Sequence, residues 1–249
     1  MPIVLPGQRR VALGSMLGAQ VAREVWARQA VIDGWQKRFP GDTPTLQQLQ
    51  GVQSVARLES SYGAWGNHPR CGNNGVGSHN WGGTQCPYSK CPKGQPCPPG
   101  TFECKDTYPT ANGSVEYTVC FYTYPTPADG AASVIANMGP KARPLTWAAL
   151  KTGDATAIST AMYDEHYYGG FGSTREARIE GHIKALTSSA QKIATGLEEP
   201  LVIVRGGSQP GPSPGAQGGS GSGLTLVKAA AAMGVGVLAV WGYQQFAKR

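Results

Sequence analysis

Charge is scarce in this sequence, and no segment gathers it into a binding patch. Charged side chains make up 15% of the 249 residues. No run of Lys and Arg with interleaved aromatic residues is present, so we expect no nucleic-acid partner. The four histidines, His68, His79, His166 and His182, are too scattered to predict a set of metal ligands. We therefore expect neither a metal nor another cofactor.

The charge that is present has one prevailing sign. The 22 basic residues outnumber the 15 acidic ones, and the formal net charge is +7. This balance suits an anionic partner such as a membrane surface or a bacterial wall, although an ordinary basic soluble protein has it too.

Cysteine pairs of the CxxC kind, which are typical of zinc sites, are also absent. Six cysteines nevertheless occur within one 50-residue stretch that is rich in proline and glycine. This clustering favours disulfides in a loop-rich lobe over zinc ligands or free thiols, and it leaves the pairing open. The six are Cys71, Cys86, Cys91, Cys97, Cys104 and Cys120.

We expect no secretory signal in residues 1–10, although disulfides imply an oxidising compartment. Residues 1–10 carry two arginines but lead into an amphipathic stretch rather than an uninterrupted apolar one. We expect an extracytoplasmic or virion-associated protein that leaves the cytoplasm by another route, such as release by lysis.

Helical periodicity dominates the first 60 residues. Apolar side chains at helical spacing in residues 11–39 predict a long amphipathic helix, within an N-terminal segment of residues 1–40. Thr43 followed by Pro44 predicts the start of a second helix that runs into Glu59. The apolar stripe of the first helix is Leu13, Leu17, Val21, Val25, Ile32, Trp35 and Phe39, and that of the second is Leu46, Leu49, Val52 and Ala56.

Helices return after a loop-rich middle. Thr126 and Pro127 predict a helix start, a short helix is expected over residues 154–162, and residues 173–176 read as a capping box before a last helix. The expected inward positions are Ala131, Val134, Ile135 and Met138, then Ile179, Ile183, Leu186, Ala190 and Ile193.

The middle of the chain has strand character. Residues 114–124 alternate between β-branched or aromatic residues and polar ones, and Asn112 with Gly113 predicts a hairpin turn before them. The sequence therefore predicts a mainly α member of the α+β class. A helical domain at residues 41–200 would carry a Cys-rich β-hairpin lobe at residues 71–120.

The C-terminal part differs in composition. Residues 206–223 hold 11 Gly or Pro in 18 positions, which predicts a flexible linker. Residues 224–246 are apolar apart from four polar residues, and Trp241 and Tyr243 stand near their end. If Lys228 extends to the interface, this length suffices to cross a bilayer, so we expect a transmembrane anchor. The alternative is a helix that lies on a surface or packs against the protein.

Glu59 is the residue that most resembles a catalytic group. It follows Val55 and Leu58 at the end of an apolar helix and precedes Tyr62 and Trp65. Apolar surroundings raise the pKa of a carboxyl group, as a general acid in glycoside cleavage requires. Taken alone, however, a Glu at a helix end is more often a solvated surface residue.

Four short motifs occur in the order found in one family. Residues 58–63, Leu-Glu-Ser-Ser-Tyr-Gly, resemble the Glu-Ser-Gly-(Trp/Tyr)-Gly signature of lysozyme-like muramidases, lytic transglycosylases and endo-β-N-acetylglucosaminidases. Residues 80–83, Asn-Trp-Gly-Gly, and residues 121–124, Phe-Tyr-Thr-Tyr, are similar to segments that follow in the glucosaminidases of autolysins, flagellar assembly and phages. Residues 166–169, His-Tyr-Tyr-Gly, resemble the turn before the last helix of that family.

This resemblance implies a lysozyme-like fold and an enzyme that cleaves β-1,4 bonds in the glycan strand of bacterial peptidoglycan. Glu59 would be the catalytic acid. Aromatic faces and amides suit N-acetyl sugars, although the aromatic residues would equally suit the core and Asn80 a turn. The substrate-binding residues expected are Tyr62, Asn80, Trp81, Tyr124, Tyr167 and Tyr168.

The sequence departs from the family pattern in three places. Ser61 stands where the signature has glycine, and the Cys-rich insertion is far longer than the family's connection. A second acid has no clean match; Asp106 and Glu103 are the candidates, with Asp106 preferred. Hydrolysis by a second carboxylate and ring closure by the sugar's own 6-hydroxyl, as in transglycosylases, therefore both stay open.

Two other classes of function compete with this one. The chain would be a catalytically inactive wall-binding or structural virion protein if Glu59 plays no part. It would be a thiol-dependent amidase or peptidase if one cysteine is free. Residues 164–166, Asp-Glu-His, look like a catalytic cluster but are interpreted as a solvated loop.

Overall fold

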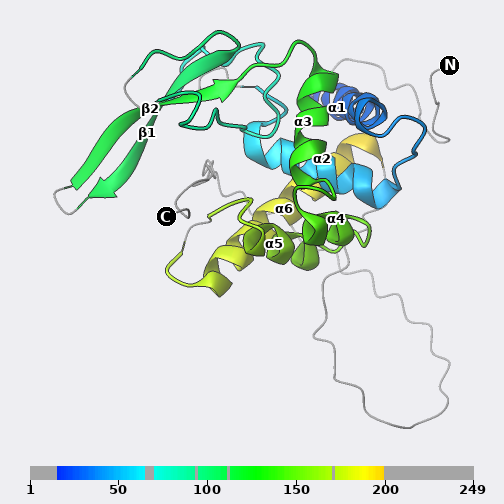
Figure 1. Cartoon of the computed structure of the whole chain (residues 1–249). Coiled ribbons are helices and arrows are strands. Elements are labelled where there is room, and N and C mark those ends of the chain that lie inside the picture. The colour runs from blue at the N-terminus through cyan, green and yellow to red at the C-terminus, as the bar shows by residue number, and fades with distance from the viewer. Residues whose placement is uncertain (1–15, 65–69, 93–94, 111–112, 170–171, 199–249) are drawn as a thin grey trace, which may run out of the picture.

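The computed structural model describes residues 16–64, 70–92, 95–110, 113–169 and 172–198 (Figure 1). Within these residues the chain forms six helices and one antiparallel pair of strands, which confirms the mainly α member of the α+β class. The elements are α1 (Met16–Arg38), α2 (Leu46–Ser60), β1 (Thr101–Thr110), β2 (Gly113–Tyr122), α3 (Pro127–Met138), α4 (Pro144–Leu150), α5 (Ala155–Asp164) and α6 (Arg175–Leu197).

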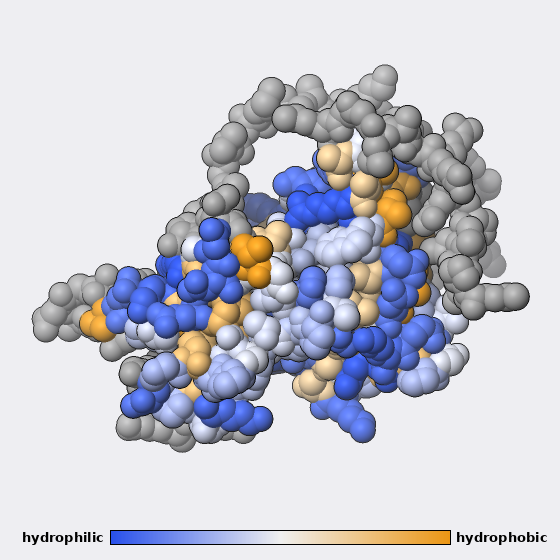
Figure 2. All heavy atoms as spheres, turned by 90° about the horizontal axis from the view of Figure 1, so that it is seen from above, coloured by the Kyte–Doolittle hydropathy of each residue, from blue (hydrophilic) through white to orange (hydrophobic). Residues whose placement is uncertain are grey.

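The predicted linker, residues 206–223, and the predicted anchor, residues 224–246, lie outside the described residues. In the part of the chain that is described, no helix is long and apolar enough to cross a bilayer. The face seen in Figure 2 is mostly hydrophilic, with hydrophobic side chains in small groups.

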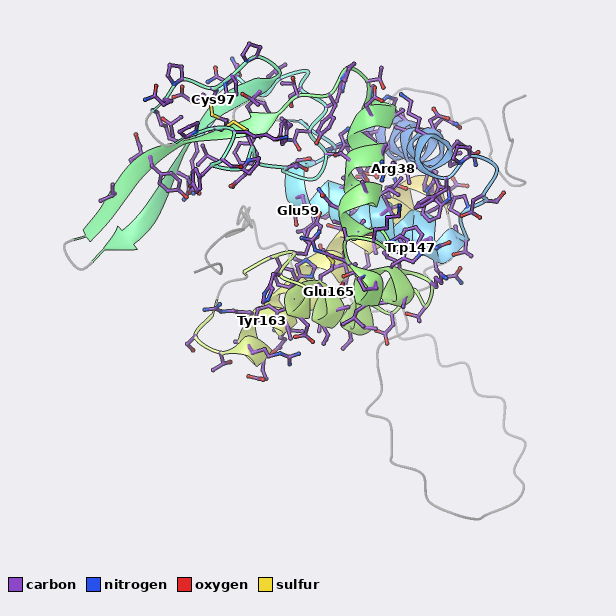
Figure 3. The ribbon with its side chains drawn as sticks, viewed as in Figure 1. Arg38, Glu59, Cys97, Trp147, Tyr163 and Glu165 are labelled. Carbon is purple, nitrogen blue, oxygen red and sulfur yellow. A yellow bond between two sulfur atoms is a disulfide. The ribbon has the colours of Figure 1, made fainter. Side chains whose placement is uncertain are left out.

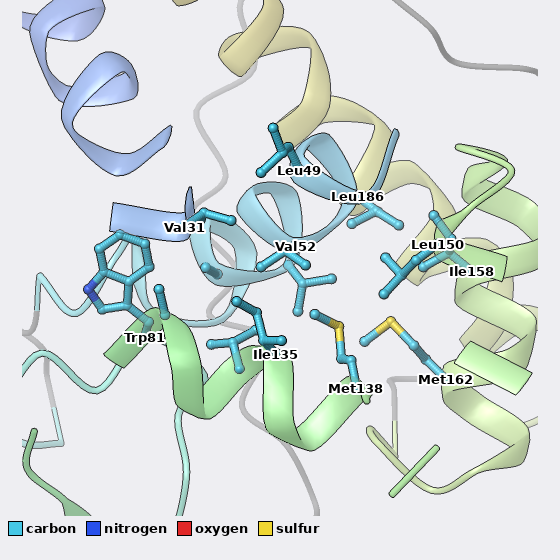
Figure 4. Packing of buried hydrophobic residues seen from close by; sticks show 14 of the residues in the cluster. Val31, Leu49, Val52, Trp81, Ile135, Met138, Leu150, Ile158, Met162 and Leu186 are labelled. Atoms are coloured by element: carbon cyan, nitrogen blue, oxygen red, sulfur yellow. The ribbon is translucent and has the colours of Figure 1, made fainter. Parts of the chain in front are cut away.

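Helix α2 lies in the middle of the helical part and contacts α1, α3, α4 and α6, while the hairpin projects to one side (Figure 1). One buried cluster joins these helices (Figure 4). Helix α1 contributes to it, so this helix shares one core with the helices that follow. Core residues from different helices include Val31, Val52, Ile135, Leu150 and Met162.

The buried face of α1 differs from the predicted stripe. Trp35 is buried as expected, but Val25 is 36% exposed, and Leu13 lies outside the described residues. The buried face of α1 is formed largely by small residues, because α3 packs too closely for larger side chains. A Cβ atom on Gly34 would lie 2.7 Å from the backbone nitrogen of Ala132. The residues of α1 that face the core are Ala27, Ala30, Val31, Gly34 and Trp35.

Two helix starts lie at neighbouring residues rather than at the predicted ones. Thr45, not Thr43, caps α2, because Gln48 three residues later completes a reciprocal capping box. Leu46, three residues after Thr43, offers no such acceptor. At α6, the backbone N–H of residue 177 donates to the Thr174 hydroxyl, so Thr174 rather than Ser173 is the cap. The Thr126 cap of α3 is confirmed.

The hairpin lobe is held by three disulfides, which confirms the reading of the cysteines (Figure 3). The pairs are Cys71–Cys104, Cys86–Cys91 and Cys97–Cys120. All six cysteines of the chain are therefore paired, and this contradicts both the free-thiol and the zinc alternatives. Gly113, predicted in the turn, is instead the first residue of β2 and pairs with Thr110.

Candidate active site

Glu59 is the penultimate residue of α2, at the end of the helix that faces the hairpin lobe (Figure 3). The chain leaves the helix abruptly after it. Ser61 and Tyr62 have φ angles of 52° and 63°, in the left-handed region that non-glycine residues rarely adopt. The Ser61 N–H donates to the Arg57 carbonyl oxygen at 3.0 Å and closes the helix end. This turn directs the chain away from α2 and leaves Glu59 at the junction of helices and lobe.

A buried polar network holds that turn. The Glu24 carboxylate on α1 is fully buried and forms an ion pair with Arg57 at 3.1 Å. It also accepts hydrogen bonds from the Tyr62 hydroxyl and from Gln53 Nε2, the latter at 3.2 Å. A buried carboxylate is tolerated only when paired and hydrogen-bonded in this way. The network fixes the backbone three residues beyond Glu59.

The environment of Glu59 suits a proton donor. The residue keeps partial contact with solvent, whereas protein atoms surround it closely on the remaining sides. This burial penalises the charged form and raises the pKa of Glu59 from 4.5 to about 8. The carboxyl forms no hydrogen bond or ion pair within the described residues. It is therefore protonated at neutral pH and available to an incoming group.

Two glycines lie close to this carboxyl group and to the Tyr167 hydroxyl. A Cβ atom on Gly83 would lie 3.8 Å from Glu59 Oε2, and one on Gly82 would lie 3.7 Å from the Tyr167 hydroxyl oxygen. Gly83 also has a φ of +57°, which side chains disfavour. Tyr167 is buried, and its pKa is raised by burial and then by the charge of Glu59. Glu59, the glycine pair and Tyr167 thus form one site from three distant segments.

Asn80 fixes the conformation of the loop that contains Gly82, Gly83 and Thr84. Its Nδ2 donates to the carbonyl oxygens of Thr84 and Tyr122, both at 2.9 Å, and its Oδ1 accepts from the Thr84 N–H at 2.8 Å. The Ser60 hydroxyl donates to the Trp81 carbonyl oxygen at 2.7 Å. The loop is therefore tied both to the hairpin and to the end of α2. The hydrogen bonds of the Asn80 amide are thus made to the protein itself.

The other residues predicted to bind substrate occupy different places. Trp81 is fully buried in the core, and Tyr62 is 3% exposed, with its hydroxyl on Glu24. Tyr168 is equally buried and stacks on His182 at a centroid distance of 3.9 Å. Tyr124 is half-buried. Among these aromatic residues, Tyr167 is the one whose pKa the charge of Glu59 raises.

The candidate second acids lie on β1 and have local partners. Asp106 forms an ion pair with Arg70 and accepts a hydrogen bond from the Tyr117 hydroxyl at 3.1 Å. Glu103 pairs with Lys105 at 3.0 Å. Neither charge is among the causes of the pKa shifts of Glu59 and Tyr167. Their assignment as a second acid stays a prediction.

Glu165, interpreted above as part of a solvated loop, has a structural role instead. Its carboxylate accepts hydrogen bonds from the N–H groups of Leu145 and Thr146, both at 2.8 Å, and so caps α4. In the described part of the chain, no three His, Cys, Asp or Glu side chains gather as metal ligands.

Arg143 is a residue near the site that the sequence did not indicate. Its guanidinium lies 4.9 Å from the centre of the Tyr167 ring. No motif marks this position; it stands before Pro144, outside the predicted helices.

Comparison with known proteins shows no match to a protein-family model and none to a curated protein. Two solved structures are similar at low identity. The catalytic domain of the autolysin Auto from Listeria monocytogenes has a TM-score of 0.45 and 13% identity, over 74% of this chain and 90% of that one. A peptidoglycan hydrolase mutant from Sphingomonas sp. A1 has a TM-score of 0.38 and 14% identity, over 71% and 96%.

Proposed function

We propose that this protein cleaves β-1,4 glycosidic bonds in the glycan strand of peptidoglycan, with Glu59 as its general acid. One observation carries the proposal: the carboxyl of Glu59 has a pKa of about 8 and faces a loop of two glycines. The order of the four short motifs around it supports the same activity. The three disulfides fit the extracytoplasmic compartment in which this polymer lies.

The chemistry follows from one protonated carboxyl group. Glu59 donates its proton to the leaving oxygen as the bond from that oxygen to the anomeric carbon breaks. The electron pair of the bond remains on the leaving oxygen. An incoming hydroxyl oxygen then bonds to the anomeric carbon, and its proton passes to the Glu59 carboxylate, which restores the acid.

The incoming hydroxyl distinguishes two reactions. Water would give a reducing sugar, and the sugar's own 6-hydroxyl would give an anhydro ring. The pKa shift of Glu59 arises from burial and includes no contribution from a neighbouring carboxylate. We therefore propose that Glu59 serves as acid and then as base, which suits the ring-closing reaction; a second carboxylate such as Asp106 would favour hydrolysis.

The first experiment compares the full-length chain with its Glu59→Gln variant on purified peptidoglycan, with the products read by mass spectrometry. Glutamine keeps the size of the side chain but has no proton to give. We expect products only from the wild type. Anhydro ends would assign a lytic transglycosylase, and new reducing ends a hydrolase together with the bond it cuts. Equal cutting by both proteins would remove Glu59 from catalysis. No cutting by either would favour the catalytically inactive wall-binding or structural virion alternative.

We also propose that residues 206–223 tether the enzyme to an anchor at residues 224–246. Such a layout would hold the enzyme at a membrane while it cuts nearby wall. Co-sedimentation of the full-length chain with anionic vesicles, compared with a chain that ends at residue 205, tests this arrangement. Equal sedimentation of the two chains would contradict it.

A further inference from the structure

Two segments form the walls of the site around Glu59. One is the loop of Gly82, Gly83 and Thr84, and the other is the turn that carries Tyr167 after α5. Each must keep its place relative to Glu59 for the reaction to proceed, because small displacements at a reacting centre cost much of the rate. Residues that contact both segments are therefore candidates for control of the geometry.

Arg143, between α3 and α4, is connected to both walls. Its guanidinium stacks on the Tyr167 ring at 4.9 Å. The same group donates to the Asn137 carbonyl oxygen at the end of α3. Asn137 Nδ2 in turn donates to the Thr84 hydroxyl at 3.2 Å. One side chain thus links the tyrosine turn to the helix end that contacts the glycine loop.

Apart from its hydrogen bond to Asn137 at the end of α3, Arg143 lacks, in the part of the chain that is described, two common structural roles of an arginine, a bond to its own helix and an ion pair. Arg143 occupies the N-cap position of α4, but its side chain makes no capping hydrogen bond. Within the described residues it forms no ion pair, and its Nε is buried without a hydrogen-bond partner. A buried donor without a partner lowers stability. The contact with Tyr167 connects this arginine to the site around Glu59.

We propose that Arg143 is a positioning residue, which holds Tyr167 and the Thr84 loop in the geometry that Glu59 needs. This inference rests on the proposed glycosidase function. An arginine suits the task because its planar guanidinium stacks on a ring and donates a hydrogen bond at the same time. Lysine would retain the charge and lose the stacked plane.

The test measures kcat and KM on peptidoglycan for the full-length chain and its Arg143→Ala and Arg143→Lys variants, at a temperature where all are folded by circular dichroism. We expect Arg143→Ala to lower kcat by about tenfold and to leave KM within about twofold, since a loss of positioning acts on the reacting geometry. Arg143→Lys should recover part of the loss.

Arg175→Ala is the matched control. Arg175 also stacks on a tyrosine, Tyr163, at 5.8 Å, and pairs with Asp164 at 2.7 Å. It lies at the start of α6, and these two partners belong to α5 rather than to the loop of residues 82–84 or to Tyr167. We expect this variant to keep the wild-type kcat. An equal loss of kcat in Arg143→Ala and Arg175→Ala would mean that the effect is a general loss of stability. This result would overturn the proposal.

A double-mutant cycle with Tyr167→Leu shows whether Arg143 acts through the tyrosine ring. If it does, Arg143→Ala should lower kcat little further once the ring is gone. Independent, multiplying losses would overturn the proposal, and so would a rise in KM at constant kcat, which indicates direct sugar binding. Failure of the proposed function is a separate result, in which the wild type and Glu59→Gln behave alike.

Discussion

At the scale of single residues, Glu59 and His182 respond to pH in opposite directions because burial acts on an acid and on a base. Burial raises the pKa of Glu59 to about 8 and lowers that of His182 to about 4. In both cases the folded protein favours the neutral form. The raised pKa of Glu59 matters for the proposed chemistry, and the lowered pKa of His182 matters for the packing of α6.

For Glu59 we expect activity and stability to change over the same pH range. In the proposed mechanism the protonated acid is the active form, so kcat/KM should fall as pH rises through about 8. The raised pKa also means that its contribution to stability is complete below pH 4.5 and is lost as pH rises through about 8. Glu59→Gln should therefore gain stability over the wild type across this interval, by up to about 1 kcal/mol per pH unit. Thermal unfolding at several pH values measures the difference; a constant difference would contradict the shifted pKa.

For His182 the dependence of stability on pH has the opposite sign. Its ring is 3% exposed, stacks on Tyr168, and has Nδ1 2.9 Å from the Ser159 hydroxyl oxygen. Its contribution to stability is present above pH 6.5 and is lost as pH falls toward about 4. The free energy of unfolding should drop by up to about 3 kcal/mol over this interval in the wild type and not in His182→Gln. Denaturant titrations at pH 7 and pH 4.5 on both proteins provide the check.

At the scale of elements, the role of a glycine in a helix depends on what packs against it. The residues next to it in the sequence do not reveal this. A Cβ on Gly34 would meet the backbone of α3, 2.7 Å from Ala132 N and 2.8 Å from Ala128 O. A Cβ on Gly181 in α6 would have nothing within 4 Å. The same substitution therefore has opposite expected effects in the two helices.

We expect Gly34→Ala to destabilise the protein by at least about 2 kcal/mol, because the clash is with backbone and exceeds the gain in helix propensity. Gly181→Ala should stabilise it by about 0.5–1 kcal/mol, since only the propensity changes. Urea unfolding of the two single variants measures both. If Gly34→Ala were also stabilising, α1 and α3 would not pack as closely as described.

At the scale of the whole molecule, the disulfide-bonded lobe and the helical part meet at Glu59. The Cys86 N–H donates to the Cys120 carbonyl oxygen at 2.8 Å, and the Tyr122 N–H donates to the Thr84 carbonyl oxygen at 3.1 Å. The hairpin is thus bonded to the loop that lies next to Glu59. The helices have their own core, which contains no cysteine.

Reduction should therefore abolish activity before it unfolds the helices. We expect dithiothreitol to release the lobe and lower peptidoglycan cleavage at least tenfold, as expected when a positioned segment is displaced, while the far-ultraviolet dichroism of the helices persists. Reoxidation should restore cleavage. Full activity of a reduced sample whose six thiols titrate would show that the loop keeps its place without the disulfides.

Local patterns determined much of this protein. Helical periods and caps predicted α2, α3, α5 and α6 to within a few residues, because these signals depend on neighbours along the chain. Clustered cysteines predicted the disulfide lobe. Glu59 was singled out by the resemblance of residues 58–63 to a known signature, since a Glu at a helix end is by itself more often a solvated residue. Helix α4 was not predicted, since the carboxylate that caps it belongs to Glu165, 19 residues beyond Thr146.

Only the tertiary structure decided which aromatic and polar residues surround Glu59. Sequence places Trp81, Tyr167 and Tyr168 alike in glycine-rich turns, and all three are buried in one cluster. Within it, Tyr168 stacks on His182, whereas the charge of Glu59 acts on Tyr167. The Asn80 amide finds a partner 42 residues away at Tyr122. Burial and hydrogen bonding depend on whatever packs against a side chain, and those neighbours come from distant parts of the chain, beyond the range of any local pattern.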